Sequence, residues 1–175
     1  MERAKHTCWS CGAVFVDVGR VPLSCPRCGT IPQVPPPAFP RALLQKVPWS
    51  FVTKAPPELA AFRAAIVAYH KDLSTGAGAG GEDGGGDAGR VLPEALFDVV
   101  LPTWRVRVVF PYRGDDANVL VEQKEPVTAL SLLHQVHRAW GTKLARQDHH
   151  FFEGFSLLRG PRGTEPPVYS MRLGS

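Results

Sequence analysis

Two short stretches near the start of the chain decide its organisation, Cys8-Trp9-Ser10-Cys11-Gly12 and Cys25-Pro26-Arg27-Cys28-Gly29. They contain all 4 cysteines of the sequence, as two Cys-x-x-Cys pairs that are each followed by glycine. Two thiolates at this spacing wrap one side of a metal ion, and the glycine lets the backbone turn tightly and bring its amides toward sulfur. Together the pairs supply the four sulfurs of a closed, tetrahedral zinc site. We therefore expect the four cysteines to bind Zn²⁺.

Three other interpretations of these cysteines compete with a zinc site. Four unrelated buried thiols would not share both the spacing and the trailing glycine. A redox-active Cys-x-x-Cys needs only one pair, placed at the start of a helix, and neither pair here opens a predicted helix. Iron in place of zinc is compatible with four thiolates, so the sequence leaves the identity of the metal open.

The residues between the two pairs predict a short hairpin. β-branched residues flank Gly19-Arg20, where the chain is expected to turn. We call each Cys-x-x-Cys-Gly turn a knuckle. The order of knuckle, hairpin and second knuckle resembles the zinc-ribbon or rubredoxin-like family over residues 6–31. The resemblance implies Zn²⁺ held by Cys8, Cys11, Cys25 and Cys28. It implies no particular activity, because ribbons serve polymerases, translation factors, nucleases and interaction modules alike.

Composition divides the chain into three parts, a zinc ribbon at 1–31, a proline-rich strap at 32–56 and a larger domain at 57–175. The strap contains Pro32, Pro35, Pro36, Pro37, Pro40 and Pro48, which favours an extended spacer. Leucine, valine, tryptophan and phenylalanine interleave with the later prolines, so part of the strap should pack against the larger domain. Residues 74–90 are rich in glycine and acids and predict a disordered loop.

Hydrophobic periodicity predicts an α+β fold for residues 57–175. Apolar residues at helical spacing indicate a helix over 58–74 and another that begins near Thr128, which can cap it, and continues to 144. Alternating apolar residues indicate strands at 104–110, 117–123, 151–158 and 168–173. The expected architecture is a mixed domain with a mainly antiparallel sheet and two main helices.

The sequence Asp148-His149-His150-Phe151-Phe152-Glu153 is the most unusual polar cluster of the larger domain. Regular alternation along a strand would place Glu153, and His149 with it, on the apolar face that points to the core. His134 and His137 on the preceding helix could face the same way. His149, His150 and Glu153 are therefore candidate residues of a metal-dependent hydrolase. The competing interpretation is structural, because no spacing matches a hydrolytic motif such as H-E-x-x-H.

Arginines on one predicted hairpin suggest a nucleic-acid surface as a further alternative. Arg105, Arg107 and Arg113 lie near Trp104 and Tyr112, and aromatic residues among arginines can stack bases. The formal net charge of +4 falls to about +2 once four thiolates bind Zn²⁺. That is weaker than the basic stripe of a nucleic-acid binder, so an ordinary solvated strand face is the simpler interpretation.

No apolar run is long enough to span a bilayer, and the first residues lack the apolar region of a secretory signal. We expect a cytoplasmic protein without a membrane partner. Its function is expected to be recognition, with another protein as the partner. Nucleic-acid binding through the ribbon and hairpin arginines is the first alternative, and metal-dependent hydrolysis by the 148–153 cluster is the second.

Overall fold

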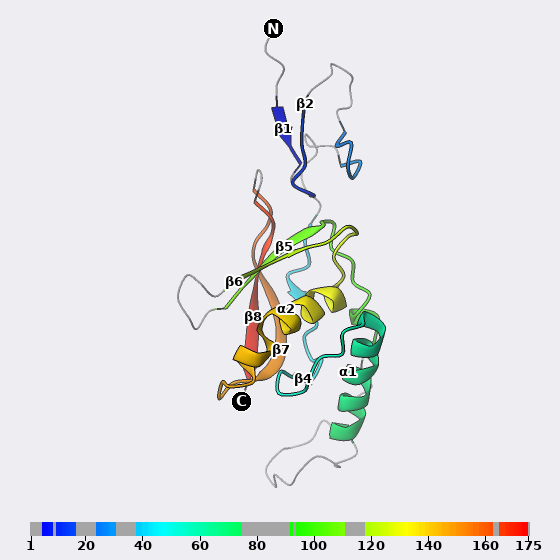
Figure 1. Ribbon diagram of the computed structural model, residues 1–175, viewed down its shortest axis with the longest axis vertical. Coiled ribbons are helices and arrows are strands. Elements are labelled where there is room, and N and C mark those ends of the chain that lie inside the picture. Colours follow the sequence, from blue (N-terminus) through cyan, green and yellow to red (C-terminus); the bar gives the residue numbers. More distant parts are fainter. Residues whose placement is uncertain are drawn as a thin grey trace.

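The computed structural model describes residues 5–8, 10–16, 24–30, 38–74, 92, 94–110, 118–162 and 165–174. Its cysteine-bearing end stands apart from an α+β body, and the C-terminus lies at the far side of that body (Figure 1). The expected turn at Gly19-Arg20, the glycine-rich loop beyond Ser74 and the first part of the strap lie outside the described residues.

The cysteine-bearing end contains a two-stranded antiparallel sheet. Strand β1 (Lys5–Thr7) pairs with β2 (Val14–Val16), so that Lys5 lies opposite Val16 and Thr7 opposite Val14. The first Cys-x-x-Cys pair forms the connection between these strands. Strand β2 therefore has a partner in β1, a strand before the first knuckle that the sequence pattern did not predict.

The body is built on a six-stranded sheet in the order β3-β7-β8-β5-β6, with β4 also paired to β7. Its strands are β3 (Ala42–Leu43), β4 (Trp49–Ser50), β5 (Arg105–Val109), β6 (Asn118–Glu122), β7 (Phe151–Arg159) and β8 (Val168–Gly174). The β5–β8 pairing is parallel and the other pairings are antiparallel. The α+β class and the mainly antiparallel sheet are confirmed.

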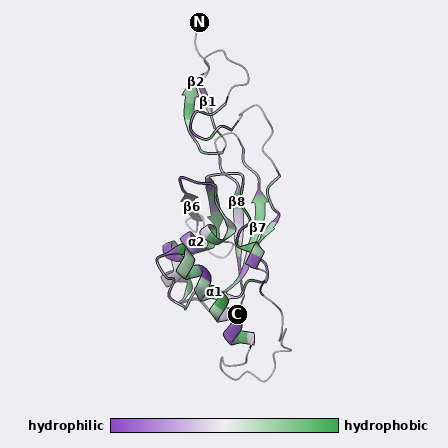
Figure 2. Cartoon of the chain, turned by 90° about the vertical axis from the view of Figure 1, so that its right-hand side faces the viewer, coloured by the Kyte–Doolittle hydropathy of each residue, from purple (hydrophilic) through white to green (hydrophobic). Residues whose placement is uncertain are grey.

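Helices α1 (Leu59–Ser74) and α2 (Ala129–Leu144) begin and end close to the predicted positions. Helix α1 turns Phe62 and Ile66 into the core, as its spacing predicts, whereas Leu59 and Leu73 at the same spacing are exposed. Helix α2 is capped by Thr128, whose side chain accepts a hydrogen bond from the backbone N–H of Ser131. The two helices pack on each other, and Figure 2 shows them on one side of the body with β7 toward the other. A short 3₁₀ helix (Glu94–Leu96) precedes β5.

The described part of the strap belongs to the core of the body. Six of its apolar residues, Phe39, Leu43, Leu44, Val47, Trp49 and Phe51, are buried, whereas Val52 is exposed. It runs along one edge of β7, first as β3 and then as β4. Leu44 and Lys46 have positive φ values of 52° and 70°, which bend the chain between the two short strands. The expected packing of the strap is thus confirmed, whereas its two strands were not predicted.

Strand β7 does not alternate regularly, and this corrects the prediction for Glu153. Phe152 and Phe155 are both buried, while Glu153 is exposed and Phe151 is 39 % exposed. The register shifts between Phe152 and Gly154, where Gly154 has a φ of 124°. A Cβ at Gly154 would lie 3.1 Å from the backbone oxygen of Leu43 in the strap. The bulge lets the strap approach β7 closely, and it turns Glu153 away from the core.

Candidate metal centre

The two cysteine knuckles have the same backbone geometry. In the first, Gly12 N–H donates to Cys8 O at 2.8 Å and Cys8 N–H donates to Ala13 O at 2.9 Å. In the second, Gly29 N–H donates to Cys25 O at 2.8 Å and Cys25 N–H donates to Thr30 O at 2.8 Å. Gly12 and Gly29 have φ values of 73° and 72°, a region that glycine enters without steric cost. The trailing glycines therefore serve the tight turn that the sequence predicts.

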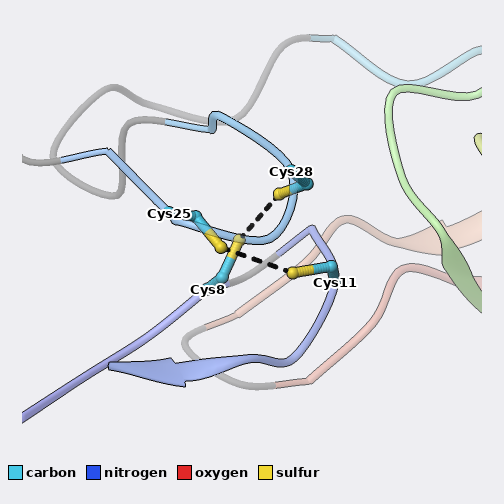
Figure 3. Close-up of side chains that lie close together, drawn as sticks. All are labelled: Cys8, Cys11, Cys25 and Cys28. Carbon is cyan, nitrogen blue, oxygen red and sulfur yellow. Dashed lines mark hydrogen bonds between the residues drawn. The ribbon is translucent and has the colours of Figure 1, made fainter. Parts of the chain in front are cut away.

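The four cysteine side chains converge on one point (Figure 3). Cys8 Sγ lies 3.5 Å from Cys28 Sγ, and Cys11 Sγ lies 3.5 Å from Cys25 Sγ. All four sulfurs are within 4.8 Å of one another. Tetrahedral Zn–S bonds of about 2.3 Å place sulfurs about 3.8 Å apart, so the arrangement fits a metal ion bound by all four.

Burial disfavours the ionised thiolate form of these cysteines unless a metal ion is bound. Cys8 is 0 % exposed, and Cys11 and Cys25 are each 2 % exposed. Burial raises the pKa of the Cys8 and Cys11 thiols. Burial also acts to raise the pKa of Cys28, but hydrogen bonding with Thr30 and with neighbouring cysteines outweighs it and lowers that pKa to about 7. A bound cation would take the place of the protons and stabilise the thiolates.

The first knuckle is anchored to the body through Ser10, one of the two residues between its cysteines. The backbone oxygen of Ser10 accepts hydrogen bonds from Thr103 Oγ1 at 2.9 Å and from Trp104 N–H at 3.2 Å. The Trp104 side chain packs against the cysteine cluster. The guanidinium of Arg27, from the second knuckle, lies 5.7 Å from the centroid of the Trp104 ring. Both knuckles thus contact the residues that lead into β5.

Arg105, the first residue of β5, lies against the first knuckle. A Cβ added at Gly12 would overlap its guanidinium. On its other side, Arg105 Nε lies 3.5 Å from Glu122 Oε2 on β6. Four thiolates with one Zn²⁺ carry a net charge of −2, so Arg105 and Arg27 place positive charge beside the site. The sequence pattern put Trp104 and Arg105 on a candidate nucleic-acid surface and gave no sign of their contacts with the knuckles.

The candidate hydrolytic residues do not gather into a site. His149 and Glu153 are exposed, and His150 is half-buried with its Nδ1 3.2 Å from Gln147 O. Among the residues that the structure describes, the four cysteines form the one group of three or more potential metal ligands. The 148–153 cluster is therefore a surface segment at the start of β7.

His134 and His137 have structural partners elsewhere. Trp49 Nε1 donates to His137 Nδ1 at 2.8 Å, and His134 Nε2 lies 2.8 Å from Pro56 O. Burial, with a smaller contribution from the charge of His134, lowers the pKa of His137 to about 4. The two histidines attach the strap to α2, and among the described residues they form no group of potential metal ligands with His149 or Glu153.

The remaining arginines of the predicted hairpin are only partly described. Arg107 Nη1 donates to Asn118 Oδ1 at 3.3 Å across the β5–β6 pair. Arg113 and Tyr112 lie outside the described residues. No signal in the sequence indicates that Thr103 would anchor the first knuckle, because the contact joins residues far apart in the chain.

Comparison with known protein families gives a match over the first part of the chain. A family model described as "Protein of unknown function (FYDLN_acid)" is similar to residues 3–54. The matched region covers both knuckles and the strap through β4, so it extends beyond the ribbon itself. No curated protein and no solved structure matches the chain. Within the described residues, no helix has both the length and the apolar character required to cross a membrane.

Proposed function

We propose that this chain is a zinc-binding recognition protein in which one Zn²⁺, held by Cys8, Cys11, Cys25 and Cys28, shapes an end of the molecule that binds another protein. The observation that carries the proposal is the convergence of four sulfurs within 4.8 Å of one another. Four sulfurs fill a tetrahedral coordination sphere, so no position remains for a water or a substrate. Such a site suits a structural role.

The anchoring of the first knuckle supports this role. Ser10 accepts two hydrogen bonds from residues that lead into β5, and Trp104 packs on the cysteines. Among the described residues, the short β1–β2 pair has little core beyond the cysteine cluster and the side chains packed on it, Ala13, Phe15 and Trp104. Metal binding therefore supplies the stability that a segment of this size lacks, and it holds the segment against the body.

The exposed face of β2 supports a protein partner. Val14 is 66 % exposed and Val16 is 40 % exposed, whereas Phe15 between them packs on the cysteine cluster. Two neighbouring valines on the outer face of a metal-held strand suit the apolar core of a protein interface better than a phosphate backbone. The partner that fits this face is a protein with an apolar patch of its own.

The nucleic-acid alternative draws less support from these contacts. The Trp104 ring packs against the cysteines, and the Arg27 guanidinium lies 5.7 Å from the centroid of the ring. Arg105 lies between Gly12 and Glu122. These side chains are engaged within the protein, so base stacking and phosphate contacts would have to displace existing interactions.

Metal content is tested first. Elemental analysis of the purified full chain is expected to give about one zinc per chain, and Cys8→Ser or Cys28→Ser should lose it. Iron in the wild-type protein would assign a different metal to the same residues. Unchanged metal content in both variants would contradict the site.

The partner is tested with a matched pair of surface variants. A protein that co-purifies from the native host is identified, purified and titrated against the zinc-loaded chain. The double variant Val14→Asp/Val16→Asp should weaken this binding about tenfold or more, because it places charges in an apolar interface. The control Leu73→Asp changes a residue of α1 that is 48 % exposed and should bind as the wild type does. Equal binding by all three proteins would contradict the proposed face, and submicromolar oligonucleotide binding that falls with salt would favour the nucleic-acid alternative.

A further inference from the structure

An open cleft lies between the strap and the second half of α2, on a part of the body that the proposed function does not use. Its volume is about 490 Å³, within the usual range for small-molecule sites. One wall is formed by residues 51–55, which follow β4. The other is formed by Arg138, Gly141, Thr142 and the residues just beyond the end of α2.

The walls of the cleft carry positive charge. Lys54 comes from the strap side, and Arg138 and Arg146 come from the α2 side. All three are exposed, and within the described part of the chain none of them is in an ion pair. The described residues that line the cleft include no aspartate or glutamate. Three like charges around one opening repel one another, and a bound anion would relieve that repulsion.

His137 adds a buried hydrogen-bond donor to the cleft. Its Nδ1 accepts the hydrogen bond from Trp49 Nε1, and an indole N–H can only donate. Because burial lowers the pKa of His137 to about 4, the ring is neutral at pH 7 and its proton lies on Nε2. The side chain is 6 % exposed, and no hydrogen-bond partner of Nε2 is found among the described residues.

Gly141 determines where this donor lies. A Cβ at Gly141 would lie 2.7 Å from His137 Nε2, so the absence of a side chain lets the ring edge rest against the helix at the cleft wall. Phe51, which also lines the cleft, is 2 % exposed and lies 5.0 Å from the His137 ring, centroid to centroid. The cleft thus combines a neutral N–H donor, the exposed side chain of Val52 and three cations.

We propose that this cleft binds a small phosphate monoester that carries an apolar or aromatic group. The phosphate lies among Lys54, Arg138 and Arg146 and accepts a hydrogen bond from His137 Nε2–H. The apolar group packs against Val52, which lines the cleft and is 59 % exposed. A phosphate monoester carries up to two negative charges, which suits three cations better than the single charge of a carboxylate.

The test uses phenyl phosphate as the probe and the full, metal-loaded chain. Binding is measured by titration calorimetry, and the imidazole nitrogen signals of His137 are followed by NMR during the same titration. Phenyl phosphate is expected to bind about tenfold more tightly than benzoate or inorganic phosphate, and to shift the Nε2 signal of His137. The double variant Arg138→Gln/Arg146→Gln should weaken binding about tenfold or more.

Lys143→Gln is the matched control, because Lys143 is an exposed cation on the same helix that does not line the cleft. It should leave the affinity for phenyl phosphate within about twofold of the wild type. If Lys143→Gln and the double variant weakened binding equally, the attraction would be a general effect of charge and the proposal would be wrong. Binding that leaves the His137 signals unmoved would also overturn it.

Discussion

Ser10 and Thr103 join the cysteine-bearing end to the body, since the backbone oxygen of Ser10 accepts a buried hydrogen bond of 2.9 Å from Thr103 Oγ1. Ser10 lies between the first two cysteines, so the contact attaches the first knuckle directly to the residue pair that precedes β5. This hydrogen bond therefore links the metal centre to the residues that lead into the six-stranded sheet.

Thr103→Val should loosen this connection. Valine keeps the shape of threonine but removes the hydroxyl, which also accepts from Arg105 N–H at 3.2 Å. The loss is expected to cost about 1–3 kcal/mol in the free energy of unfolding of the zinc-loaded protein, because Arg105 N–H loses its acceptor and Ser10 O keeps only the Trp104 N–H donor. Thr103→Ser keeps the hydroxyl and should cost less. If denaturant unfolding showed no cost for Thr103→Val, or a larger cost for Thr103→Ser than for Thr103→Val, the methyl group and not the hydrogen bond would be the important feature.

Gly12→Ala should be more damaging than Gly29→Ala. Both glycines have nearly the same positive φ, 73° and 72°, so alanine carries a similar backbone cost of about 1–2 kcal/mol at each. At Gly12 the new Cβ would also overlap Arg105, whereas nothing lies within 4 Å of a Cβ at Gly29. The two variants are compared by competition for zinc against a chelator and by denaturant unfolding.

Combining each variant with Arg105→Ala isolates the contact. The excess cost of Gly12→Ala should shrink in that background, while the cost of Gly29→Ala should not change. Equal costs of the two glycine substitutions in the wild-type background would show that Arg105 swings away freely and that only the backbone conformation matters.

His137 should make the free energy of unfolding depend on pH. Its pKa is about 4 in the folded protein, against 6.5 for an unperturbed histidine, because burial disfavours the charged ring. The unfolded state therefore binds the extra proton first, and the free energy of unfolding should fall as the pH is lowered from about 6.5 to about 4. His137→Phe removes this proton and should flatten the dependence in that interval, although it lowers stability at pH 7 by leaving Trp49 Nε1 without an acceptor.

His149→Gln is the control for this measurement, because His149 is exposed. The metal centre contributes its own pH dependence to all three proteins, so the comparison rests on differences between their unfolding curves. An identical slope in the wild type and His137→Phe would show that His137 takes up its proton equally in both states.

Alanine should be tolerated at position 153 but should destabilise the protein at position 154. Glu153 is exposed, so Glu153→Ala is expected to change the free energy of unfolding by less than about 0.5 kcal/mol. Gly154 has a φ of 124° and faces the strap, where an added Cβ would lie 3.2 Å from Gln45 Cα, so Gly154→Ala should cost about 1–3 kcal/mol. Thermal or denaturant unfolding measures the cost of each variant. A large cost for Glu153→Ala would indicate that Glu153 is buried, as a regular strand register predicts.

Much of the fold follows from local patterns. The helical spacing of Phe62 and Ile66 and the alternation of Val106 and Val108 depend on residues close in the chain, and each predicted the buried face correctly. The two-residue strands β3 and β4 are too short to show any period, so the proline-rich strap was not recognised as part of the sheet.

The cysteine spacing and the trailing glycines by themselves determined the four converging ligands, because each knuckle closes through hydrogen bonds within six residues of chain. Only the tertiary structure decided the direction of Glu153, the partners of His134 and His137, and the attachment of Ser10 to Thr103. Each of these depends on backbone that arrives from a distant part of the sequence. The close approach of the strap to Gly154, for example, shifts the register of β7 in a way that alternation along the strand cannot reveal.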